Sequence, residues 1–186
     1  MGKISAGVDE AGRGPLAGPV VAAAVILPEG CEIDGLNDSK KLSPQRREHL
    51  FHQIKGLAII TGVGIVEPEE IDRINILRAA LLAMEVAVKN LNPQPDYLLI
   101  DGNIRTSLLI PQETVIKGDS RCCSIAAASI IAKVIRDSIM DDYHKIYPEY
   151  NFKRHKGYPT QEHFDALRKF GPCPIHRRTF NGVFSR

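Results

Sequence analysis

The chain has 186 residues, of which 44% are hydrophobic and 25% are charged. This length and balance are typical of a soluble globular protein with a sizeable core, and we expect residues 1–186 to form a single domain. No apolar run approaches the roughly 20 residues of a membrane-spanning helix, and the residues before the first expected strand are too few for a signal peptide. We therefore expect a cytoplasmic protein that does not associate with membranes.

Basic residues gather at the end of the chain. The net charge is only +2, but residues 153–186 carry eight Lys or Arg against two acids, a balance of +6. A basic end beside an acid-rich body favours binding of a polyanion near metal-holding carboxylates. We interpret the segment from about 144 to 186 as a basic, substrate-contacting C-terminal extension, although a solvated basic tail would carry the same charge.

Short apolar runs and amphipathic segments alternate along the chain, which is typical of an α/β fold. Apolar runs bounded by turn residues predict strands at 4–8, 20–26, 57–66, 97–100 and 114–116. Helical periodicity and start signals predict helices at 44–54, 71–88, 124–137 and 161–169. The segment 144–160 is expected to be an ordered loop, and the tail after it has no clear period beyond the last helix.

Two adjacent acids, Asp9 and Glu10, end the first predicted strand, and Gly12, Arg13 and Gly14 follow at once. Neighbouring strand residues point to opposite faces, so both carboxylates can serve one site only if the backbone bends, as glycine allows. Arg13 would then be held where a phosphate or polyol could sit. A strand that ends in a solvated acidic turn is the plain alternative.

Four carboxylates share a position at the end of a predicted strand, next to glycine or a turn: Asp9, Glu10, Asp101 and Asp119. Groups at the strand ends of an open α/β sheet converge on a crevice at one edge. Converging carboxylates repel one another unless cations lie between them, and an all-oxygen ligand set selects Mg²⁺ first and Mn²⁺ next. Two such ions roughly 3.5 to 4 Å apart can activate a water and stabilise the leaving oxygen of a phosphoryl displacement.

Together, these motifs resemble bacterial ribonuclease HII, of the type 2 ribonuclease H family. The resemblance spans almost the whole chain and rests on the segments 7–14, 38–42, 101–102, 117–119, 124–137 and 155–160. It implies an RNase H-like mixed five-stranded sheet flanked by helices, with a C-terminal helical extension. It also implies an endoribonuclease that hydrolyses RNA in RNA/DNA hybrids and cuts 5′ of single ribonucleotides embedded in duplex DNA, leaving a 3′-hydroxyl.

Carried over position by position, the resemblance assigns the catalytic, metal-binding role to the four strand-end acids named above, with Mg²⁺ or Mn²⁺ as cofactor. It assigns reading of the 2′-hydroxyl, the group that separates RNA from DNA, to Gly12, Arg13 and Gly14. Tyr158 would stack near the ribonucleotide-deoxyribonucleotide junction. Lys40 and Lys41 could merely solvate a loop, but the resemblance favours phosphate contact. We expect a monomer whose partners are RNA/DNA hybrids and ribonucleotide-containing DNA duplexes.

Five other residues keep two interpretations. An ion pair or a role at a helix end suits Asp137 better than metal binding does. Ser129 and Lys133, four residues apart, suit buried packing and phosphate contact equally well. Arg177 and Arg178 suit contact with a nucleic-acid backbone, unless they only decorate the tail. The six histidines show neither a catalytic-triad nor a metal-binding spacing, so we expect structural or exposed histidines.

Two rival functions fit parts of the pattern. A structure-specific DNA nuclease of the same broad fold would use similar acids but would ignore the 2′-hydroxyl. A non-catalytic nucleic-acid binding protein would need the basic end but not four strand-end acids.

Overall fold

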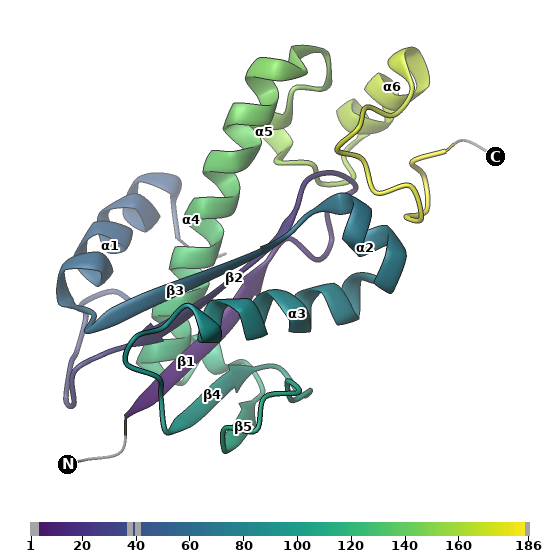
Figure 1. The fold of residues 1–186 in the computed structure, drawn as a ribbon. Coiled ribbons are helices and arrows are strands. Elements are labelled where there is room, and N and C mark those ends of the chain that lie inside the picture. Colours follow the sequence, from purple (N-terminus) through teal and green to yellow (C-terminus); the bar gives the residue numbers. More distant parts are fainter. Residues whose placement is uncertain (1–3, 37–38, 40–41, 185–186) are drawn as a thin grey trace.

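The computed structural model describes residues 4–36, 39 and 42–184. A mixed five-stranded sheet with the order β3-β2-β1-β4-β5 lies at its centre (Figure 1). The strands are β1 (Ser5–Ala11), β2 (Val20–Ile26), β3 (Ile60–Val66), β4 (Tyr97–Asp101) and β5 (Gln112–Val115). β1 pairs antiparallel with β2 and parallel with β4, so it occupies the middle of the sheet. The predicted fold class is confirmed.

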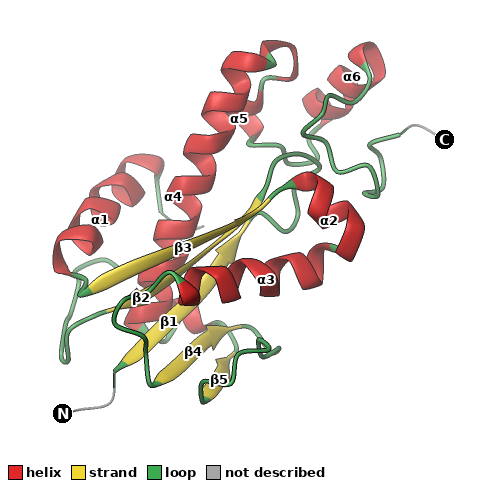
Figure 2. Cartoon of the chain, in the orientation of Figure 1, coloured by secondary structure: helices red, strands yellow, loops and turns green. Residues whose placement is uncertain are grey.

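Helices cover both faces of the sheet (Figure 2). They are α1 (Pro44–Leu57), α2 (Pro68–Ile74), α3 (Ile76–Lys89), α4 (Cys123–Ile146), α5 (Phe152–His155) and α6 (Gln161–Phe170), with short 3-10 turns η2 (Gly118–Ser120) and η3 (Pro148–Tyr150). No helix in the described part of the chain is long and apolar enough to cross a membrane.

Two hydrophobic cores lie on the two faces of the sheet, and the side chains of β2 alternate between them. Val20, Ala22, Ala24 and Ile26 pack against α3, whereas the alternate residues of the strand face α1 and α4. All seven residues of β2 are buried, because a central strand covered on both faces has no solvent side. Because both faces of β2 are covered, the strand appears in the sequence as a continuous apolar run.

Close approach of α4 to β1 depends on small residues. A Cβ atom at Gly7 would overlap the backbone of Ser124 and Ile125 in α4, and Ala127, Ala128 and their neighbours in α4 are buried. This helix therefore packs tightly against β1. It fixes the end of β1, where Asp9 lies, against the helix.

One predicted helix is two helices. The expected helix 71–88 breaks at Asn75, which has φ 71° and whose side-chain oxygen accepts the backbone N–H groups of Leu77 at 3.0 Å and Arg78 at 3.1 Å. Asn tolerates positive φ better than most residues and makes an effective N-cap. The apolar period continues across the break, so periodicity alone could not reveal it.

The segment 144–160 is not a loop throughout. α4 extends to Ile146, and η3 and α5 follow before Thr160 caps α6 by accepting the N–H of His163. The first strand is also longer than predicted, because β1 continues to Ala11 and so contains both Asp9 and Glu10. The third strand is shorter, because α1 continues to Leu57.

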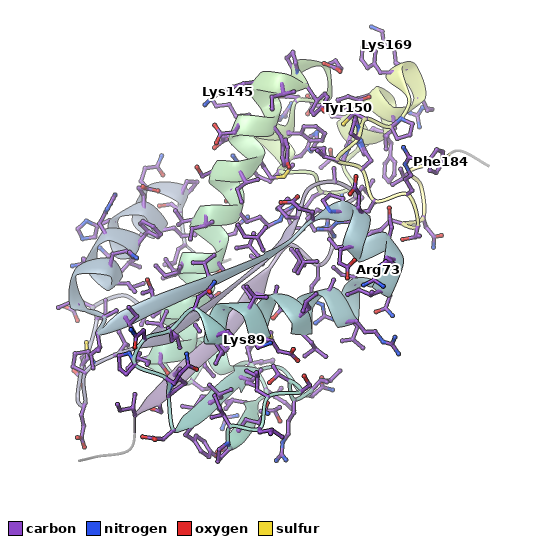
Figure 3. The ribbon with its side chains drawn as sticks, viewed as in Figure 1. Arg73, Lys89, Lys145, Tyr150, Lys169 and Phe184 are labelled. Atoms are coloured by element: carbon purple, nitrogen blue, oxygen red, sulfur yellow. The ribbon has the colours of Figure 1, made fainter. Side chains whose placement is uncertain are left out.

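A third core joins the C-terminal extension to the rest of the molecule. Tyr150, Phe152 and Leu167 pack with Met140 of α4 and with Leu16 and its neighbour in the loop between β1 and β2. Tyr150 lies between the end of α4 and α6 (Figure 3) and its hydroxyl donates to the carbonyl of Gly171 at 2.6 Å. The extension therefore rests directly on the loop that follows the two acids.

Candidate active site

The side chains of Asp9 and Glu10 point to opposite faces of the sheet. Asp9 pairs with Ala23, which faces α4, and Glu10 pairs with Ala22, which faces α3. Asp9 is 5% exposed and accepts the backbone N–H of Glu10 at 2.7 Å. The alternation expected from strand geometry is thus present. Both residues follow the last residue of β1 that pairs with β4, while β1 stays paired with β2 as far as Ala11.

Asp101 joins this pair from the neighbouring strand. It is the last residue of β4, and the parallel register that pairs Val8 with Ile100 places Asp101 beside Asp9. Asp101 also lines one pocket together with Glu10 and Arg13. Three of the four predicted acids therefore meet at one edge of the sheet.

Burial and mutual repulsion act on these carboxyl groups. Desolvation, followed by the charges of Glu10 and Asp101, raises the pKa of Asp9 well above its ordinary value. Desolvation also raises the pKa of Glu10, while Arg13, whose guanidinium lies 3.4 Å from the Glu10 carboxylate, opposes this rise. Carboxylates crowded in this way favour a bound cation.

Asp119 lies in the adjoining turn η2. The turn is attached to the site because the N–H of Gly118 donates to Asp101 Oδ1 at 2.7 Å. Asp119 is half-buried and lines a different pocket, with Leu36 and Cys122. The fourth acid thus directly follows Gly118, the residue that is hydrogen-bonded to Asp101, but its side chain lines a separate pocket.

The donor set fits a hard divalent ion. The acids supply only oxygen, as Mg²⁺ and Mn²⁺ prefer, and the burial of Asp9 beside two further carboxylates leaves negative charge without full solvation. In the residues that the structure describes, no three His, Cys, Asp or Glu side chains form a ready-made metal-binding group. We infer that side-chain rotation would have to complete the coordination of a metal here.

Of the predicted ribose-reading residues, Gly14 lies next to Tyr158 and Gly12 lies against Arg136. Gly12 is buried with φ 102°, and a Cβ on it would overlap the side chain of Arg136. A Cβ on exposed Gly14 would lie 3.6 Å from a Tyr158 ring carbon, and the Tyr158 side chain is itself 39% exposed. Lys40 and Lys41 lie outside the described residues.

Arg177 does not touch solvent, so the prediction of a nucleic-acid contact is wrong for this residue. Its side chain is fully buried, and it donates to backbone carbonyls of the loop after β1. Arg136 of α4 is buried in the same way. The sequence does not indicate that either arginine is buried and bound to the loop, because the partners are backbone oxygens rather than side chains of a recognisable type.

Three more of the ambiguous residues are placed by their contacts. Asp137 accepts Lys133 Nζ at 2.7 Å and lies 3.9 Å from Arg47, so the predicted ion pair is confirmed. Ser129 is buried and its hydroxyl lies 2.9 Å from that of Ser39.

Three histidines, His155, His163 and His176, are buried in the C-terminal extension. Their ring nitrogens bond to one another and to backbone groups, as expected for structural histidines. Burial lowers the pKa of His163 and of His176 to about 4, so both are neutral at pH 7.

Known proteins of one family are similar to this chain over almost its whole length. Residues 6–183 match the model of the family described as Ribonuclease HII. The Ribonuclease HII of Geobacter metallireducens is 60% identical over 178 residues, which cover 96% of this chain and 84% of that protein.

Solved structures agree as well. The ribonuclease H2 of Pyrococcus horikoshii OT3 is 29% identical, with a TM-score of 0.80, over 97% of this chain and 95% of that chain. A structure of the PCNA:RNase HII complex from Archaeoglobus fulgidus matches at 26% identity with a TM-score of 0.77, over 95% of both chains. These matches confirm the RNase H-like fold. The chain belongs to the ribonuclease HII family and is an endoribonuclease of the ribonuclease H type.

Proposed function

We propose that this ribonuclease H cuts 5′ of single ribonucleotides embedded in duplex DNA, as well as hydrolysing RNA in RNA/DNA hybrids, and leaves a 3′-hydroxyl. The observation that carries the proposal is the meeting of Asp9, Glu10 and Asp101 at the edge of the sheet, directly before a loop that faces Tyr158. Cutting chemistry and ribose recognition would then be adjacent. The enzyme would act as a monomer in the cytoplasm, in removal of ribonucleotides from DNA.

Two divalent ions, Mg²⁺ or Mn²⁺, would be held by Asp9, Glu10, Asp101 and Asp119. Bound there, such ions activate a water and stabilise the leaving oxygen in phosphoryl transfer. The protein's own contribution is to hold the acids in place. The N–H of Glu10 fixes Asp9, and the N–H of Gly118 fixes Asp101.

Recognition of the substrate would come from the loop and the extension. Gly12, Arg13 and Gly14 would contact the 2′-hydroxyl, and the exposed face of Tyr158 would stack on the sugar-base step that follows. Lys40 and Lys41 would contact phosphates together with the basic extension. Their contribution should appear as a dependence of affinity on salt concentration.

A labelled DNA duplex with one embedded ribonucleotide, incubated with Mg²⁺, tests the proposal. We expect a single cut on the 5′ side of the ribonucleotide and no cut in the same duplex made only of DNA. Equal cleavage of both duplexes would instead indicate a DNA nuclease.

The variant Asp101→Asn tests the assignment of the acids. Asn keeps the oxygen that accepts the Gly118 N–H but removes the charge, so the fold should be retained. We expect loss of turnover with retained binding of the duplex, whereas substantial activity would show that Asp101 is not a ligand.

A further inference from the structure

The guanidinium of Arg177 is bonded to the loop between β1 and β2. Its Nε donates to the carbonyl of Gly18 at 3.0 Å, one terminal nitrogen donates to Arg13 at 3.1 Å and Pro15 at 2.8 Å, and the other donates to Gly12 at 2.6 Å. The backbone N–H of Arg177 also donates to the carbonyl of Leu16 at 2.8 Å. One residue of the C-terminal tail thus holds five carbonyls of the loop.

Arg136 holds the end of the same loop and joins it to the segment that carries Tyr158. It donates to the carbonyl of Ala17 at 3.1 Å, to Pro19 at 3.0 Å and to Lys156 at 3.1 Å. The N–H of Leu16 donates to Gly157 at 2.8 Å. The loop and the tyrosine segment are therefore cross-linked through one guanidinium and one backbone bond.

These bonds dictate where the loop amides point. In a trans peptide, the carbonyl of one residue and the N–H of the next point in opposite directions. The carbonyls of Gly12 and Arg13 face the buried Arg177, so the N–H groups of Arg13 and Gly14 face away from it. Both of these residues are exposed, so their two N–H groups point outward. The Tyr158 ring lies close by at Gly14, 3.6 Å from the position that a Cβ atom would take.

Both arginines keep their charge without a direct ion pair, although Asp72 raises the pKa of Arg177, and Tyr158 and Asp137 raise that of Arg136. Among the described residues, neither guanidinium takes part in an ion pair with an acid, and burial lowers the pKa of Arg177 to about 9 and that of Arg136 to about 10. Each is therefore protonated at pH 7. The two buried guanidinium groups bind the carbonyl oxygens on the inner side of the loop. The N–H groups on its outer side are then available to bind an electron-rich oxygen.

We propose that Arg177 and Arg136 are positioning residues for ribose selection. They hold the Arg13 and Gly14 amides outward, and at a fixed place relative to Tyr158, so that the pair can bind the oxygen of a 2′-hydroxyl. This inference rests on the proposed function and adds to it two residues that touch no substrate. It also explains Gly12, since any side chain there would displace the Arg136 guanidinium.

The variant Arg177→Lys tests the proposal. Lysine keeps the charge, but its single nitrogen cannot reach four carbonyls at once. Binding to a duplex with one ribonucleotide and to the same duplex made only of DNA is measured by fluorescence anisotropy, with Ca²⁺ as the only divalent ion. We expect the preference for the ribonucleotide to fall at least about tenfold, because several hydrogen bonds are lost.

Amide hydrogen exchange gives a second readout that needs no substrate. In Arg177→Lys, the hydrogen-bonded amides of Leu16 and Gly18 should exchange at least about tenfold faster, because local opening of the loop becomes easier. Arg136→Lys is the second variant if Arg177→Lys folds poorly. It should speed exchange both in the loop and at residues 156–158, since Arg136 bonds to both.

Leu50→Ala is the matched control. Leu50 is fully buried, and the core cluster to which it belongs includes no residue of the loop 12–18 or of the segment 156–158. The substitution therefore lowers stability without a direct effect on the loop. Its ribonucleotide preference should equal that of the wild type. Retained preference in both arginine variants, or an equal loss in Leu50→Ala, would overturn the positioning role. A wild-type protein without any preference would instead refute the proposed function, before any variant is compared.

Discussion

Two of the buried histidines, His163 and His176, make the stability of the C-terminal extension sensitive to acid. The N–H of Cys173 donates to His176 Nδ1 at 3.0 Å, so His176 Nε2 carries the proton and donates to His163 Nε2 at 2.9 Å. His163 Nδ1 then donates to the carbonyl of Tyr158 at 3.0 Å. These partners fit one neutral tautomer for each of the two rings, and both rings must be neutral for this chain of hydrogen bonds to form.

The sign and size of the effect follow from the pKa values. Burial lowers the pKa of His163 and His176 to about 4, against about 6.5 in the unfolded chain. Below pH 6.5 the unfolded state therefore binds more protons, and stability falls as the pH drops toward 4. At about 1.4 kcal/mol per pH unit and group, the pair should lose about 3 kcal/mol between pH 7.5 and 5.5.

Urea unfolding at both pH values measures this loss. The double variant His163→Gln with His176→Gln cannot titrate, so the difference in its free energy of unfolding between pH 7.5 and 5.5 should be smaller than that of the wild type by about 3 kcal/mol. Other titrating groups are common to both proteins and cancel in the comparison. An equal pH dependence in both proteins would refute this chain of hydrogen bonds between neutral rings.

Three further predictions concern the sheet, a helix start and the acids. Gly7→Ala should lower the free energy of unfolding, measured by urea titration, by about 1–3 kcal/mol. The Cβ of the new alanine would overlap the backbone of α4, which cannot move aside as a side chain can. Asn75→Ala should destabilise more than Asn75→Gly, because alanine loses both the cap and the tolerance of φ 71°; equal losses would show that the backbone is not strained. Asp9→Asn should raise the melting temperature in EDTA, since it removes a buried charge that Glu10 and Asp101 repel, and should abolish cleavage; a lower melting temperature would contradict the repulsion.

The sheet and the site acids could be predicted from the sequence because both follow from local rules. Strand ends are marked by Asp or Gly after short apolar runs, and Asp9, Glu10 and Asp101 lie where such runs end. The roles of these residues depended on a family resemblance rather than on spacing. Asp119 shows the limit, because its strand and turn could be predicted but not the separate pocket that it lines.

The arginine contacts could not be predicted, for a physical reason. Arg136 and Arg177 bond to loop carbonyls between 117 and 165 residues away in the chain, and every residue carries a carbonyl, so no residue type marks the partner. A basic residue in a basic tail indicates solvent or nucleic acid by composition alone. Only the fold shows that Arg177 of this tail lies inside the molecule.

In the proposed function, the end of β1 serves two tasks that need different surroundings. The acids would have to be buried and close together, which makes the folded protein less stable without a cation. The following loop would need a fixed backbone with exposed amides. Backbone carbonyls bound by buried arginines meet the second need without adding any carboxylate that would compete for metal. The arrangement therefore keeps negative charge on the strand ends and positive charge behind the loop, only a few residues apart in the chain.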